Sequence, residues 1–373
     1  MKKFALLNLV LVLSLLLGTA VLAQEGDFGV VQRTADAALD GWSPVISADA
    51  LYENLMDGDT SNDPFIVSVR SPEHYALGHI PGAINIPWKE IAKSESLALL
   101  PTDQPIVVYC YTGHTGQVTA TVLKNLGYDV QNLKFGMMGW SMNDEVVVAT
   151  RFGPDTDARD YPLETEANEA TETYDYPVLD TGADDVEEIV RVAADMALSE
   201  WSPTISADAL FENMNDGDTS NDPVIVSVRS ADSYALGHIA GAINIPWNQI
   251  AKPENLAKLP ADAPIVVYCY TGHTGQVAAT VLKMLGYDVQ NLKYGMMGWT
   301  LDDEVLGTSR YDPATAPDYT VEGTAAEEAE TETEAPPTVP ETGGIPFPVE
   351  GLLVGLGSLT AAAGVYLRRR KAA

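Results

Sequence analysis

The sequence predicts an α/β fold in two tandem domains, each a mainly parallel sheet flanked by helices. The chain repeats itself with an offset of 159 residues, the separation of Cys110 from Cys269. Each copy contains short, nearly continuous apolar runs, which are typical of strands buried on both faces. Between the last two runs lies a segment with apolar residues at helical spacing, and a strand–helix–strand order of this length predicts a parallel sheet. A repeat this long predicts that each copy is a domain rather than one turn of a solenoid.

The apolar runs of the first copy predict strands at 65–69, 83–86, 105–109 and 129–133. A helix is predicted over 116–126, because Val118, Val122 and Leu126 recur at helical spacing. Gly127 follows directly and can end this helix, since glycine readily adopts the left-handed conformation found after a helix.

The first domain is predicted at 29–152 and the second at 186–311. The segments 153–185 and 312–344 are rich in Asp, Glu, Thr and Pro and poor in large apolar residues. Such segments bury too little apolar surface to offset the entropy lost on ordering, so we expect both to be extended linkers.

The first 23 residues predict a signal peptide. Lys2 and Lys3 precede an apolar run, and Val21-Leu22-Ala23 presents small residues where a signal peptidase cleaves. The alternative is an uncleaved membrane anchor.

A second hydrophobic segment, 351–367, is just long enough to span a bilayer, and the basic tail 368–373 follows it. The basic cluster predicts that this end stays in the cytoplasm and that the domains lie outside, anchored to the membrane or the cell wall. Residues 339–343, VPETG, resemble the LPxTG cell-wall sorting signal but have Val339 in place of Leu. A single membrane span and a sortase substrate both remain open.

The charge excludes one class of partner. The chain has 53 acidic and 21 basic residues, a net charge of −32. A nucleic-acid-binding surface needs clustered cations, so we expect no nucleic acid partner.

The chemistry is expected at the two cysteines. Cys110 and Cys269 each follow a buried strand and precede a helix, at the sheet edge where open α/β folds place their sites. The glycine-rich loop after each cysteine can curl so that several backbone N–H groups point at one centre, and the helix adds its positive end. Both effects favour the nucleophilic thiolate. The loops consist of Tyr111, Thr112, Gly113, His114, Thr115 and Gly116, and of Tyr270, Thr271, Gly272, His273, Thr274 and Gly275.

Three other roles for the cysteines remain open. They could be buried structural residues, or they could form a disulfide, which export permits. A metal site is disfavoured, because each copy has one cysteine, no CxxC and few histidines.

Each copy also resembles a rhodanese domain, the fold of the sulfurtransferases. The first has IVSVRSPEHYALGHIPGAINIPW at 66–88, the cysteine loop, and LGYDVQNLKFGMMGW at 126–140, and the second has matching stretches at 225–247 and 285–299. The resemblance implies that Cys110 and Cys269 are nucleophiles that accept sulfur as a persulfide, and that the loop amides cradle it. It implies a donor such as thiosulfate or a persulfide, a thiol or cyanide-like acceptor, and no organic cofactor or metal.

The copies depart from the family pattern in the loop. Many members have a cation five residues after the cysteine, where this chain has Thr115 and Thr274. His114 and His273 are the nearby candidates for a positive charge. The alternative function is therefore a non-catalytic module that binds an anion or a redox protein, with the cysteines sensing oxidation.

Other residues are expected to be structural. His79 and His238 lie in Leu-Gly-His-Ile turns and are predicted to bond nearby backbone rather than act as bases. Arg70 and Arg229 end a strand and are predicted to form internal ion pairs. The Asp-rich segments 57–63 and 216–222 are predicted to be turns, with calcium loops as the alternative.

Overall fold

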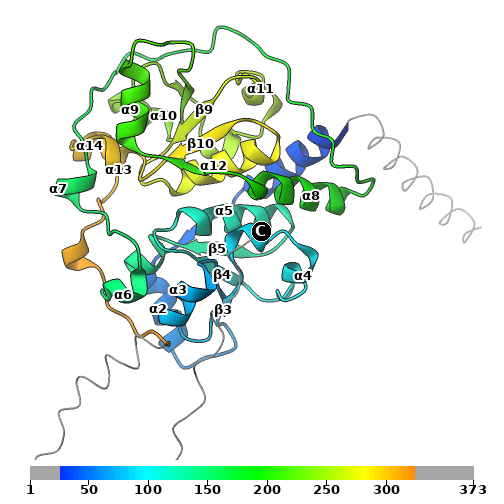
Figure 1. Ribbon diagram of the computed structural model, residues 1–373, viewed down its shortest axis with the longest axis vertical. Coiled ribbons are helices and arrows are strands. Elements are labelled where there is room, and N and C mark those ends of the chain that lie inside the picture. The colour runs from blue at the N-terminus through cyan, green and yellow to red at the C-terminus, as the bar shows by residue number, and fades with distance from the viewer. Residues whose placement is uncertain (1–25, 324–373) are drawn as a thin grey trace, which may run out of the picture. The chain divides into compact units, whose positions relative to one another are not determined.

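The computed structural model describes residues 26–323 (Figure 1). The predicted signal peptide at 1–23, the VPETG motif, the hydrophobic segment 351–367 and the basic tail 368–373 lie outside the described residues. Within residues 26–323, no helix is both long enough and apolar enough to cross a membrane.

The first domain is built on a parallel five-stranded sheet with the strand order β1-β5-β4-β2-β3. Its strands are β1 Val45–Ile46, β2 Phe65–Ser68, β3 Ile84–Asn85, β4 Ile106–Tyr109 and β5 Val130–Leu133. The helices begin with residues 26–39. They continue with α2 Ala48–Met56, α3 Pro72–Leu77, η1 Trp88–Glu90, α4 Ser94–Leu97, α5 His114–Asn125, η2 Gly136–Gly139 and α6 Asp144–Val147, and α7 Pro154–Asp157 follows the domain.

The second domain repeats this sheet with the order β6-β10-β9-β7-β8. Its strands are β6 Thr204–Ile205, β7 Val224–Ser227, β8 Ile243–Asn244, β9 Ile265–Tyr268 and β10 Val289–Leu292. Its helices are α8 Val186–Ser199, α9 Ala207–Asn215, α10 Ala231–Leu236, η3 Trp247–Gln249, α11 Pro253–Leu256, α12 His273–Met284, α13 Met296–Trp299 and α14 Asp303–Leu306, and η4 Pro313–Thr315 follows the domain.

The predicted fold class is confirmed: each domain is a parallel sheet covered by helices on both faces. Strand β4 shows why its run of apolar residues is continuous. Ile106 and Val108 lie in one core, while Val107 and Tyr109 lie in the core of the opposite face. The short edge strand β1 was not predicted, because two residues are too few to show a periodic pattern.

Helices α5 and α12 pack against each other and lie between the two sheets (Figure 1). The apolar core on this side of both sheets is continuous from one domain to the other. It contains Val118 and Val122 of α5 together with Val277 and Val281 of α12. The two domains therefore share one core.

The segment after each domain crosses to the other domain. Residues 158–168, the first strap, lie on the second domain, where the ring of Tyr161 stacks on Phe211 at 4.0 Å. Residues 316–323, the second strap, lie on the first domain, where Tyr319 stacks on Tyr52 at 3.9 Å. Both predicted linkers begin with a short helical turn, α7 or η4, and their straps dock because their aromatic residues find apolar partners.

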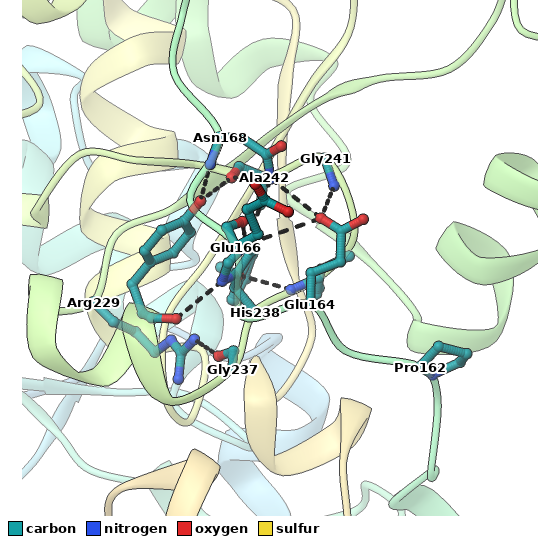
Figure 2. Close-up of polar contacts among 12 residues, drawn as sticks. Pro162, Glu164, Glu166, Asn168, Arg229, Gly237, His238, Gly241 and Ala242 are labelled. Atoms are coloured by element: carbon teal, nitrogen blue, oxygen red, sulfur yellow. Dashed lines mark hydrogen bonds and ion pairs between the residues drawn. The ribbon is translucent and has the colours of Figure 1, made fainter.

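Each strap ends beside the histidine of a Leu-Gly-His-Ile turn. Glu164 pairs with His238 through two backbone hydrogen bonds of 2.8 Å, and its carboxylate accepts the N–H of Gly241 at 3.0 Å (Figure 2). His238 Nδ1 lies 3.0 Å from the carbonyl oxygen of Tyr234. Glu322 and His79 make the equivalent backbone pair in the first domain. Both histidines thus bond backbone, as predicted.

The second strap generates a prediction about stability. The substitution Tyr319→Ala should lower the free energy of unfolding by about 2 kcal/mol, because it removes an aromatic stack and the 2.5 Å hydrogen bond that Tyr319 donates to Asp49. Urea denaturation measures this loss. Val178→Ala is the control, since Val178 is 96% exposed and its truncation should change little. Equal stabilities of Tyr319→Ala and wild type would contradict docking of the strap.

Candidate active site at the two cysteine loops

Cys110 and Cys269 are the first residues after the central strands β4 and β9. The parallel sheet therefore presents both at its carboxyl edge, as predicted. Each cysteine is free and only 1% exposed. The loop that follows is three residues long, because α5 begins at His114 and α12 at His273.

Each sulfur receives one backbone hydrogen bond from the described chain. The N–H of Gly113 donates to Cys110 Sγ at 3.1 Å, and the N–H of Gly272 donates to Cys269 Sγ at 3.2 Å. Gly113 has φ 92°, a left-handed conformation that turns its N–H back toward the sulfur and starts the helix. The next N–H groups of the helix have no partner within it and add positive potential at this end.

A second loop holds the cysteine segment from the other side. The N–H of Met137 donates to the carbonyl of Cys110 at 2.9 Å, and Met296 does the same for Cys269. Each of these loops begins with an aromatic residue at positive φ, Phe135 and Tyr294, both at 65°. Such strain in a non-glycine residue persists where surrounding contacts hold it, and it is concentrated at functional sites.

Arg70 is fully buried, and no carboxylate within the described chain pairs with it. Its guanidinium donates to the carbonyls of Val146, at 2.8 Å, and Gly78, and to Ser68 Oγ at 3.4 Å. Arg229 makes the equivalent contacts in the second domain. The predicted internal ion pairs are therefore wrong, because backbone carbonyls and a serine take the place of a carboxylate.

The guanidinium of Arg70 lies near the aromatic rings of Tyr109 and Tyr111. Its guanidinium carbon is 5.7 Å from the ring centre of Tyr109 and 5.8 Å from that of Tyr111, the two residues that flank Cys110. A buried cation without a carboxylate partner raises the positive potential around this segment.

The histidines of the two loops reach across the domain interface. His273 Nε2 accepts the N–H of Phe135 at 3.1 Å, and His114 Nε2 accepts the N–H of Tyr294 at 3.2 Å. The two imidazoles are stacked, with ring centres 6.1 Å apart. Each loop is therefore bonded to the backbone of the other domain.

These bonds require neutral histidines. Because Nε2 of His114 accepts a hydrogen bond from an amide N–H, its Nδ1 carries the ring hydrogen and donates a hydrogen bond to Thr112 Oγ1 at 3.0 Å. Burial, with Lys293 nearby, lowers the pKa of His114 to about 3. Burial, then His114 and Lys134, hold the pKa of His273 well below its usual value. Neither histidine supplies the positive charge for which it was a candidate.

The remaining predicted loop residues have separate roles. The hydroxyl of Tyr111 lies away from the sulfur, 2.7 Å from His74 Nδ1, and accepts the N–H of Ser71 at 3.2 Å. Tyr270 turns likewise toward Ser230 and Ser233. Gly116 lies against the backbone of Cys110, where a side chain would collide with Asn132. Thr274 lines the cavity at Cys269.

Sequence reasoning missed the residues that each domain contributes to the other site. Lys134 of the first domain lines the same cavity as Cys269. Tyr294 of the second domain lies near Cys110: burial raises the pKa of Tyr294, and Asp157 and Cys110 add to this shift. No signal in a single sequence identifies such residues, because the packing of the two domains brings them to the site. Among residues 26–323, no cluster of three or more metal-ligating side chains occurs.

Two stretches of the chain, 47–143 and 206–302, match the rhodanese-like domain family and together make up about half of its length. The chain belongs to this family, with two such domains in tandem.

Individual relatives cover single domains or parts of longer proteins. The chain is 38% identical over 80 residues to a thiosulfate sulfurtransferase of Pseudomonas paraeruginosa, an alignment covering 21% of this chain and 71% of the relative. It is 34% identical over 125 residues to an HTH-type transcriptional regulator of Mycobacterium tuberculosis, covering 31% of this chain and about half, 54%, of the regulator. The solved rhodanese-like domain protein of Staphylococcus aureus is 27% identical, with 26% of this chain and 88% of that chain covered and a TM-score of 0.23.

The neutral histidine pair predicts a pH dependence of stability. On acidification below about pH 6.5, histidines in the unfolded chain take up protons while His114 and His273 in the folded chain do not. The folded state therefore loses about 1.4 kcal/mol per pH unit for each histidine as the pH falls toward 3. Urea midpoints between pH 7 and 4 measure this slope.

The control is the double variant His114→Gln and His273→Gln, which keeps a hydrogen-bond acceptor but cannot titrate. Its stability should fall less steeply with acid than that of wild type. A slope equal to that of wild type would contradict the assignment of two neutral buried histidines.

Proposed function

We propose that the chain is an extracytoplasmic sulfurtransferase that carries sulfur as a persulfide on Cys110 and Cys269. The observation that carries this proposal is the backbone hydrogen bond to each sulfur. Its donor is the N–H of a glycine in the left-handed conformation, directly before the N-terminus of a helix. That environment stabilises an anionic sulfur, first as thiolate and then as persulfide. The chain also belongs to the rhodanese-like domain family and is similar to a thiosulfate sulfurtransferase, which supports the proposal of sulfur transfer.

The reaction runs in two balanced steps. The cysteine thiolate attacks the outer sulfur of the donor. A bond forms between the cysteine sulfur and this outer sulfur, and the bond between the donor's outer and inner sulfur atoms breaks. With thiosulfate the leaving group is sulfite, which departs with the electron pair. A thiol or cyanide-like acceptor then attacks the terminal sulfur of the persulfide, and the cysteine thiolate is restored. Neither step needs a metal or an organic cofactor.

A binding or redox-sensing module is the second candidate function. The observation that favours it is burial, because each cysteine is only 1% exposed and a donor therefore has little direct access to the sulfur. The similarity to a transcriptional regulator is consistent with such a role. A redox protein or an anion would then be the partner, and oxidation of the thiol would be the signal.

The first experiment is intact mass spectrometry of the purified chain after incubation with thiosulfate or an organic persulfide. We expect one added sulfur per cysteine, removed by cyanide. The variants Cys110→Ser and Cys269→Ser should each lose one sulfur, because each removes one nucleophile. Free thiols that take up no sulfur from either donor would overturn the sulfurtransferase proposal in favour of the sensing module.

The proposed location rests on the terminal sequences: the signal-like residues 1–23, the hydrophobic segment 351–367 and the basic tail. Mass spectrometry of the C-terminal peptide from cells tests the mode of anchoring. A peptide ending at Thr342 would indicate sortase cleavage, and one containing the basic tail would indicate a membrane span. Recovery of the intact chain with its first 23 residues, in the cytoplasmic fraction, would contradict export.

A further inference from the structure

The cavity at Cys269 is built from both domains. Its volume is about 280 Å³. The second domain contributes Cys269 and the loop after it, including His273 and Thr274, while the first domain contributes Val45 and Lys134. A donor bound next to this sulfur therefore also contacts the first domain.

Lys134 is the cation of this cavity. It follows β5 directly, and its backbone N–H donates to the carbonyl of Ile46 at 2.9 Å, which fixes where its side chain begins. Its ammonium lies 5.2 Å from the ring centre of Phe135. The side chain is half-buried, and within the described chain no carboxylate pairs with it.

The pKa of Lys134 agrees with its place in the cavity beside Cys269. Burial lowers the pKa of Lys134, and the facing Cys269 is the one charge that acts in the opposite direction. A half-buried ammonium that has no carboxylate partner among the described residues is incompletely neutralised. It can accept a further anion, and the cavity is the space in which that anion would lie.

The equivalent lysine of the second domain is placed differently. Lys293 is exposed and lines another cavity, of about 140 Å³, together with Asp157, Arg159 and Asp208. Carboxylates are therefore present around Lys293 but not around Lys134. The two lysines occupy the same position in the repeat, so Lys293 is a matched control.

We infer that Lys134 of the first domain binds the anionic end of the sulfur donor at Cys269, and that this site takes small oxyanion donors of the thiosulfate class. This inference rests on the proposed sulfur transfer. Thr274 stands where many family members have a cation, and in this inference Lys134 supplies that cation from the other domain. When the thiolate attacks the outer sulfur, the ammonium offsets the repulsion between two anions and then holds the departing sulfite.

The test isolates one sulfur at a time. In the Cys110→Ser background, thiosulfate should load Cys269, and intact mass spectrometry follows the rate. Lys134→Met should slow this loading about tenfold or more, and Lys134→Arg should restore most of it because the charge returns. Lys293→Met should leave the rate at Cys269 unchanged. In the Cys269→Ser background, Lys134→Met should leave loading of Cys110 unchanged.

Alkylation gives a readout that needs no sulfur transfer. The same thiolate attacks the CH₂ carbon of iodoacetate and of iodoacetamide, with iodide as the leaving group. The two reagents are nearly equal in size, but only iodoacetate is an anion. Lys134→Met should lower the ratio of the iodoacetate rate to the iodoacetamide rate at Cys269 about tenfold, while Lys293→Met should not change it.

The two readouts separate the two claims. A rate ratio that is the same in wild type and Lys134→Met would overturn the role of Lys134, even if Cys269 accepts sulfur. A ratio that depends on Lys134 in a protein that takes up no sulfur from thiosulfate or an organic persulfide would overturn the sulfurtransferase proposal while supporting the anion site.

Discussion

Two hydrogen bonds, one between each loop histidine and the opposite domain, join the two cysteine loops across the domain interface. His114 and His273 each start a helix behind a cysteine, and each accepts a backbone N–H of the other domain. The bonds need uncharged imidazoles, and burial beside the shared apolar core around α5 and α12 favours that neutral form. The donors are Phe135 and Tyr294, and two residues after each lies the methionine whose N–H bonds the carbonyl of the cysteine in the same domain. A shift of one cysteine loop therefore disturbs the other.

The two sites have the same loop but different surroundings. The sequence from cysteine to helix is the same in both copies, and so is the glycine bond to sulfur. The neighbours from across the interface differ: Phe135 and a half-buried Lys134 at one site, Tyr294 and an exposed Lys293 at the other. The proposed selectivity for an anionic donor therefore depends on Lys134, a residue outside the loop that carries the nucleophile.

The sequence predicted the elements that have a strong local pattern and missed those that depend on packing. The four apolar runs of the first copy became strands β2 to β5, while β1, with two residues, left no pattern. The predicted helix at 116–126 begins two residues earlier, at His114, because left-handed Gly113 already turns the chain. The position of each cysteine followed from the order of strand and helix. The role of Lys134 did not, since a lysine at a strand end has many possible neighbours until the domains are packed.

Several contacts between the domains are reciprocal: each loop histidine bonds the backbone of the other domain, and each strap stacks an aromatic ring on the other domain. Contacts of this kind are the mark of an isologous interface, which normally joins two identical subunits. Here the loops, the histidines and the straps all follow that rule within a single polypeptide. One copy with its own strap would carry both halves of the interface. Such a fragment is therefore equipped to form a symmetric homodimer, in which the loop histidine of each subunit bonds the backbone of the other.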